Sequence, residues 1–125
     1  MKLVVLSLVL ALSSTSALAE RTSTEVSATD AKAWIDVFDK IVDAVVAHRS
    51  DCPTMAGDLH AIIGVSQDTI RAVREAKSKG RRLPASATQR MIDGSKRMMA
   101  SLDKCGRDEH VASAFARIDL GDRKK

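Results

Sequence analysis

The chain has 125 residues, a formal net charge of +4 and a hydrophobic fraction of 45%, which are values of one ordinary globular domain. Two prolines and six glycines exclude a collagen-like or low-complexity chain. Only three residues are aromatic, and none of them is tyrosine. This composition argues against most all-β folds and against a module that stacks bases on aromatic rings, so we expect no nucleic-acid partner.

The first 19 residues have the pattern of a secretory signal peptide. A short positive start precedes an apolar run over residues 3–12, and residues 17–19 (Ala-Leu-Ala) form a small-x-small cleavage signature. The run is too short for a bilayer core of about 30 Å, which disfavours the alternative of a membrane anchor. We therefore expect a signal peptide over residues 1–19 and a secreted or periplasmic mature chain over residues 20–125 that does not span a membrane.

The two cysteines, Cys52 and Cys105, both lie in the expected mature chain. In an oxidising compartment, an even pair of cysteines predicts a disulfide. The long loop that it closes would correspond to roughly 4 kcal/mol of stabilisation in the chain-entropy model. The alternative is a pair of thiols with redox or metal chemistry, but the Cys-x-x-Cys spacing of such sites is missing.

A stripe of mostly apolar residues that recur every three or four positions predicts the first helix. The stripe comprises Trp34, Phe38, Ile41, Val45 and His48. Ser27 and Asp30 have the spacing of a capping box. The preceding residues are polar and lack periodicity, so we expect a flexible lead-in over residues 20–29 and a helix that ends near Arg49.

The second helix is predicted as one long element from about Cys52 to Lys79. Asp51 is a suitable cap, and a proline is tolerated in the first helical turn. Gly64 inside the helix costs about 1 kcal/mol relative to alanine and is a candidate for a bend. Residues 80–84 (Gly-Arg-Arg-Leu-Pro) end the helix.

Two more helices are predicted in the last third of the chain. A stripe from Ala87 to Cys105 indicates the third helix, with Gly106 as its terminator. Asp108 is the expected cap of a short fourth helix. Its inward residues are Val111, Phe115 and Ile118.

Three long helices and a short fourth, joined by short loops, predict an all-α antiparallel bundle clamped by one disulfide. We expect this domain to cover residues 30–120 and a disordered tail to cover residues 121–125. One distance conflicts with the arrangement: if the second and third helices form a tight hairpin, Cys105 lies about 10 Å from Cys52, too far for a disulfide. Either the start of the second helix folds over, or that helix bends at Gly64, or the third helix continues by a turn.

Short motifs surround the two cysteines. Cys52-x-x-Met55-Ala56-x-x-Leu59 lies in the second predicted helix, and Met98-Met99, Leu102 and Lys104-Cys105-Gly106 lie in and after the third. With these motifs the chain resembles a group of small exported all-helical bacterial proteins that carry a cysteine pair. The resemblance implies a helical fold with a disulfide over most of the mature chain. The function of that group is uncharacterised, so the resemblance implies no activity.

No constellation of catalytic residues is recognisable in the sequence. It lacks a Gly-x-Ser-x-Gly nucleophile, a phosphate-binding glycine loop, a Cys-x-x-Cys-His haem attachment and a His-Glu-x-x-His metal motif. The many carboxylates have the spacing of a solvated helix surface. We therefore expect a protein that is not an enzyme and holds no cofactor.

Charge is distributed unevenly along the mature chain. Residues 20–70 carry four basic and nine acidic side chains, whereas residues 71–125 carry fifteen basic and seven acidic ones. Six cations crowd the end of the second predicted helix and its loop; this basic tip comprises Arg71, Arg74, Lys77, Lys79, Arg81 and Arg82. The cations complement a helix dipole and are able to face the acidic first helix. As a binding site, they would contact an anionic surface such as phospholipid headgroups, envelope polysaccharide or an acidic partner protein.

Two other functions stay open. His48, His110 and Met55 are expected at one end of the bundle, where imidazole and thioether ligands would suit Cu(I) or haem. Against this carrier function, methionine at helical spacing is usually core filler. The last alternative is a structural or interaction protein that acts as an oligomer.

Overall fold

The computed structural model describes residues 24–118, which form five α-helices and no strand. The helices are α2 (Ala28–Ala47), α3 (Cys52–Val65), α4 (Gln67–Ser78), α5 (Ala85–Ser101) and α6 (Glu109–Ala116). The predicted all-α class is therefore confirmed. Within residues 24–118, no helix has the length and apolar character that crossing a bilayer requires. The predicted signal peptide (residues 1–19) and tail (residues 121–125) lie outside the described residues.

α2 forms where the apolar stripe predicts it and carries a large part of the core. The hydroxyl of Ser27 accepts a hydrogen bond of 3.1 Å from the backbone N–H of Asp30 and caps the helix. The four apolar members of the stripe, Trp34, Phe38, Ile41 and Val45, are at most 6% exposed. The helix ends at Ala47, close to the predicted position, because its amphipathic pattern is strong enough to determine its extent locally.

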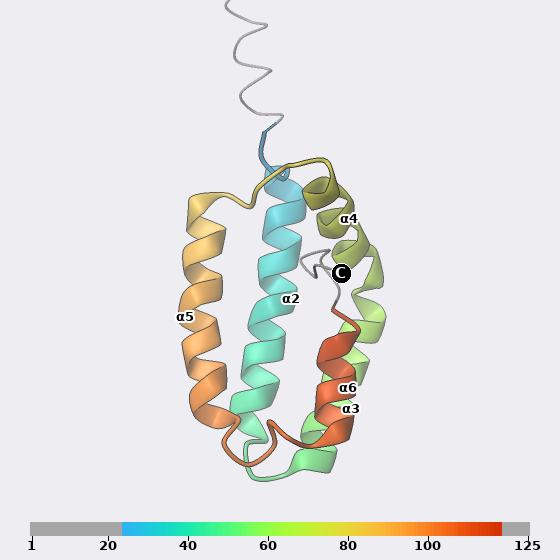
Figure 1. Cartoon of the computed structure of the whole chain (residues 1–125), viewed down its shortest axis with the longest axis vertical. Coiled ribbons are helices and arrows are strands. Elements are labelled where there is room, and N and C mark those ends of the chain that lie inside the picture. Colours follow the sequence, from blue (N-terminus) through green and yellow to red (C-terminus); the bar gives the residue numbers. More distant parts are fainter. Residues whose placement is uncertain (1–23, 119–125) are drawn as a thin grey trace, which may run out of the picture.

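The other helices are arranged around α2 (Figure 1). α5 packs on one side of α2, α3 and α4 pack on another, and α6 packs against α3. The chain reverses direction after α2, after α4 and after α5, so α5 runs parallel to α2 and α6 runs parallel to α3. Successive helices thus alternate in direction as predicted, apart from α3 and α4. Two of the packed pairs, α2 with α5 and α3 with α6, join parallel helices that are distant in sequence.

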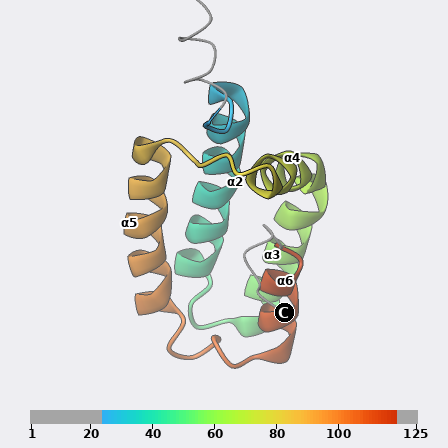
Figure 2. The ribbon, with the colours of Figure 1, turned by 45° about the horizontal axis from the view of Figure 1, so that its top comes forward.

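The second predicted helix is in fact two helices, which corrects the expectation of one continuous element. α3 ends at Val65, α4 begins at Gln67, and Ser66 separates them. The hydroxyl of Ser66 donates a hydrogen bond of 2.7 Å to the carbonyl oxygen of Ile62, a type of bond that bends helices. Gly64, the predicted site of a bend, lies inside α3 just before this break. Figure 2 shows that α4 turns across the end of the bundle and does not continue the line of α3.

The third predicted helix ends at Ser101, which corrects the expectation that it continues to Cys105. Among the described helices, the backbone of α5 comes close to α2 alone. The second and third predicted helices therefore do not form the tight hairpin that would hold the two cysteines too far apart for a disulfide. Residues 102–108 instead cross the end of the bundle to α6 (Figure 1). Cys105, in this segment, is bonded to Cys52 in the first turn of α3. The predicted disulfide with Cys52 is confirmed, with 5.3 Å between the Cα atoms.

Gly106 is not the helix terminator that the sequence suggests, because α5 has already ended. Its N–H donates a hydrogen bond of 2.9 Å to the carbonyl oxygen of Leu102. A Cβ atom on Gly106 would lie 2.6 Å from that same oxygen. The turn around Cys105 is therefore tight enough to require glycine at this position.

At the opposite end of the bundle, the segment before α2 is tied to the loop between α4 and α5. The N–H of Val26 donates to the carbonyl oxygen of Arg82 at 2.8 Å, and the N–H of Arg82 donates to the carbonyl oxygen of Thr24 at 3.0 Å. A small apolar cluster closes this end and consists of Val26, Ala31, Ala76 and Leu83. Within the lead-in predicted over residues 20–29, Val26 is buried and residues 28 and 29 already belong to α2, while residues 20–23 lie outside the described part.

Two aspartates cap helices as the sequence predicts. Asp108 accepts hydrogen bonds from the N–H groups of His110 and Val111 at the start of α6. Asp51 accepts from the hydroxyl of Thr54 at 2.8 Å and from its N–H at 3.2 Å at the start of α3. These bonds hold the pKa of the Asp51 carboxyl below its ordinary value. The cap therefore contributes its full stabilisation at a pH above the ordinary pKa of aspartate. This contribution is lost as the pH falls through the lowered pKa and the carboxylate is protonated.

Gly94 allows α5 to approach α2 closely. A Cβ atom at this position would lie 2.5 Å from Cε2 of Phe38 and 3.1 Å from Cγ2 of Val42. We expect Gly94→Ala to lower the free energy of unfolding by about 1–3 kcal/mol, because the new methyl group must displace a packed ring. Urea unfolding followed by far-UV circular dichroism measures this change.

Gly57→Ala is the matched control. Gly57 is exposed in the middle of α3, and an added Cβ atom would meet nothing within 4 Å. Both substitutions gain roughly 1 kcal/mol of helix propensity, so the difference between the two variants isolates the contact with α2. We expect Gly57→Ala to raise stability, and equal stabilities of the two variants would show that the close approach is absent.

Candidate functional site

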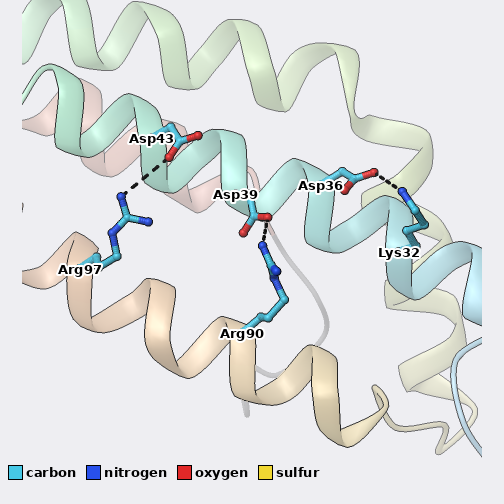
Figure 3. A network of polar contacts seen from close by, with 6 residues as sticks. All are labelled: Lys32, Asp36, Asp39, Asp43, Arg90 and Arg97. Carbon is cyan, nitrogen blue, oxygen red and sulfur yellow. Dashed lines mark hydrogen bonds and ion pairs between the residues drawn. The ribbon is translucent and has the colours of Figure 1, made fainter.

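α2 and α5 carry complementary charges along their shared face (Figure 3). Arg90–Asp39 and Arg97–Asp43 join α5 to α2, and Figure 3 also draws the pair Lys32–Asp36 within α2. All six side chains are between 39% and 79% exposed, so each pair contributes only about 0.2–1 kcal/mol. The acidic face of the first helix, one of the alternative partners for the basic tip, is thus paired with cations of α2 and α5.

The basic tip lies on α4 and in the loop that follows it. Its exposed members are Arg71, Lys79, Arg81 and Arg82, and its half-buried members are Arg74 and Lys77. Arg71 pairs with Asp68 at 3.2 Å on the surface of α4, and Glu75 is the one acidic residue between positions 71 and 82. The negative end of the α4 dipole offsets part of this positive charge. The net charge of the segment nevertheless stays strongly positive.

A left-handed turn at Gly80 gives the loop of the basic tip its path. Gly80 has a φ angle of 82°, and its N–H donates to the carbonyl oxygen of Lys77 at 3.0 Å. The N–H of Arg81 donates to Ala76 at 3.1 Å, which completes a Schellman motif. Arg82 is then held by its two backbone bonds to the segment before α2. The backbone that carries both loop arginines is therefore fixed by hydrogen bonds.

A groove of about 680 Å³ lies between this loop and α5; we refer to it as the tip groove. Four apolar side chains line it, those of Leu83, Met91, Ile92 and Met99. Four cations also line it, those of Lys77, Arg81, Arg82 and Lys96. No acidic residue of the described chain is part of the lining. The groove therefore combines apolar surface with charge of one sign.

The apolar lining of the tip groove is unusually accessible. Ile92 is 45% exposed and Met99 is 76% exposed, and Val65 is the other large hydrophobic residue that the described chain exposes. Both groove residues project from α5, whose backbone comes close to that of α2 alone among the described helices. Two of the three large hydrophobic side chains that the described residues expose thus lie in one groove.

Met91 connects the tip groove with a second hollow of about 250 Å³ between α2, α5 and α6. Its sulfur accepts a hydrogen bond of 3.3 Å from the indole N–H of Trp34. The Trp34 ring is 2% exposed, and its centroid lies 6.0 Å from that of Phe38. The only tryptophan of the chain therefore contacts a residue that lines the groove.

The predicted metal ligands lie at the opposite end of the bundle, where α2 ends and where α3 and α6 begin. Nε2 of His48 is 2.6 Å from a carboxylate oxygen of Asp58. Met55 is completely buried in the core, and His110 is exposed in the first turn of α6. Within residues 24–118, no group of three or more His, Cys, Asp or Glu side chains is placed to hold a metal ion.

The cations of the site are recognisable from the sequence because most of them are close together along the chain. Ile92 and Met99 are not singled out, because they lie beside the main apolar stripe of α5. The signal that would have found them is a second stripe: the two residues are two helical turns apart and each follows a methionine of the first stripe, Met91 or Met98.

Comparison with known protein families, with curated proteins and with solved structures finds no significant match to this chain. The resemblance to small exported helical proteins therefore stays a prediction. What the protein does must be inferred from its own surface.

Proposed function

We propose that this protein is an exported, non-enzymatic binding protein that contacts an anionic phospholipid surface through its basic tip. The observation that supports the proposal most is the gathering of six cations and one carboxylate between positions 71 and 82, at one end of the bundle. Export rests on the signal pattern of residues 1–19. The disulfide fits the same compartment, since cross-links of this kind persist in oxidising environments.

The charges of α2 and α5 also favour an external partner for the basic tip. Arg90 and Arg97 pair with carboxylates of α2. Most of the basic tip is exposed to solvent at the end of the molecule. A cation near an anionic membrane contributes about 1 kcal/mol, so four exposed cations on one short segment supply a useful affinity.

We expect the exported protein to sediment with phosphatidylglycerol vesicles at low salt and to be released by about 0.3 M salt. The release follows because salt screens attraction between exposed charges and a lipid surface. Binding is measured as the fraction of protein in the vesicle pellet across a salt series. Absence of binding at low salt, or binding that salt does not change, would contradict the proposal.

A pair of charge-matched variants locates the contact. Arg71→Gln with Lys79→Gln removes two exposed cations of the basic tip and should weaken vesicle binding by about 30-fold, or ~2 kcal/mol. Arg49→Gln with Arg107→Gln removes two exposed cations from the opposite end and should leave binding nearly unchanged. Equal loss in both variants would mean that net charge, and not the basic tip, governs binding.

A further inference from the structure

The tip groove offers two kinds of surface at once. Its cations are Lys77, Arg81, Arg82 and Lys96, and its apolar residues are Leu83, Met91, Ile92 and Met99. A lipid headgroup or free phosphate would use the cations and leave the apolar surface in water. A neutral hydrocarbon would use the apolar surface and make no use of the cations. A ligand that satisfies both has an anionic head and an alkyl chain.

We propose that the tip groove binds a free single-chain anionic amphiphile, a long-chain carboxylate, with its head at the cations and its chain along the apolar residues. The proposal rests on the proposed function, because it uses three cations of the basic tip and assigns them a ligand. The volume of about 680 Å³ lies within the range of roughly 300–1,000 Å³ that small-molecule sites occupy. Exposed methionine suits this task, since its flexible thioether adapts to chains of different shape.

Charge complementarity favours an anionic amphiphile over a second copy of the chain. The cationic lining would need an acidic surface from the partner copy. The acidic face of α2 is the obvious source, but its carboxylates Asp36, Asp39 and Asp43 are already paired with Lys32, Arg90 and Arg97. The absence of carboxylates from the described lining also removes the repulsion that an incoming carboxylate would meet.

Methionine methyl resonances provide the test. Dodecanoate is titrated into the purified exported protein below its micelle concentration. We expect the Met91 and Met99 methyl signals to shift with saturation, whereas the Met55 signal, from a side chain completely buried elsewhere in the core, should not move. Acetate, which lacks the chain, and dodecyl maltoside, which lacks the charge, should each bind at least about tenfold more weakly, a difference of ~1.4 kcal/mol or more.

Three variants assign the binding to the groove. Ile92→Gln with Met99→Gln changes two exposed side chains and should weaken dodecanoate binding by about tenfold. Arg81→Gln with Arg82→Gln should weaken it by a similar factor and remove the preference over dodecyl maltoside. Val65→Gln is the matched control, because Val65 is 88% exposed, lies on α3 and does not line the groove, so binding should be unchanged.

The outcomes separate this inference from the proposed function. If vesicles bind and Arg71→Gln with Lys79→Gln weakens that binding, but dodecanoate leaves Met91 and Met99 unmoved, the groove ligand is wrong and the surface contact stands. If dodecanoate binds and the groove variants weaken it while vesicles do not bind, the groove ligand is supported and the surface contact is wrong. Dodecanoate binding that Val65→Gln weakens as much as the groove variants, or dimerisation without any methyl shift at the groove, overturns the inference.

Discussion

Replacing both cysteines by alanine (Cys52→Ala with Cys105→Ala) is expected to lower the free energy of unfolding by about 4 kcal/mol. The cross-link joins residues 53 positions apart, so its removal releases a long loop in the unfolded chain. The loss is a large part of the roughly 5–15 kcal/mol that stabilises a typical domain. Urea unfolding of the oxidised protein and of the double variant, followed by far-UV circular dichroism, measures it.

An alkylation experiment checks the premise of that prediction. Intact mass after treatment with an alkylating reagent should show no label on the purified protein and two labels after reduction, because both cysteines are in the disulfide. The double variant should take no label under either condition. Two labels on the untreated protein would contradict the disulfide, and a loss of less than about 1 kcal/mol in the double variant would contradict its role in stability.

Trp34→Ala is expected to lower the free energy of unfolding by about 3–5 kcal/mol. Trp34 is 2% exposed and lies where α2 meets α5, with its indole N–H on Met91 and its ring beside Phe38.

Trp34→Phe is the matched variant for this position. It keeps an aromatic ring next to Phe38 but loses the hydrogen bond to Met91 and part of the volume, so we expect a cost below that of alanine. Circular dichroism is the suitable probe because both variants lack the only tryptophan. Equal costs of the two substitutions would show that the hydrogen bond, and not the buried ring, matters at this contact.

Apolar stripes and capping residues predict those helices whose position depends on nearby residues. α2 follows from its apolar stripe and from Ser27, and the caps of α3 and α6 follow from Asp51 and Asp108. The break at Ser66 does not follow in the same way, because serine is common inside helices and the bond of its hydroxyl to Ile62 becomes visible only in the folded chain. Gly64, two residues earlier, is the stronger candidate for a bend in the sequence, but α3 continues through it to Val65.

The path of α5 depends on contacts between segments far apart in sequence. A short loop after α4 predicts a hairpin, but the backbone bonds of Arg82 with Val26 and Thr24 hold that loop over the start of α2. α5 is thereby placed beside α2, where Gly94 permits close packing. The same contacts place α5 next to the loop and so form the tip groove. Most of the groove cations are adjacent in sequence and could be predicted, whereas its apolar side depends on the path of α5 and could not.

The disulfide closes the chain into a covalent ring from Cys52 to Cys105, and α3, α4 and α5 all belong to that ring. The exposed arginines Arg81 and Arg82 lie in a loop in the middle of it. A trypsin-like protease that cuts after either arginine therefore produces two fragments that stay joined through sulfur. Cleavage at either arginine would therefore leave a single covalent molecule, which separates into two chains only after the disulfide is reduced.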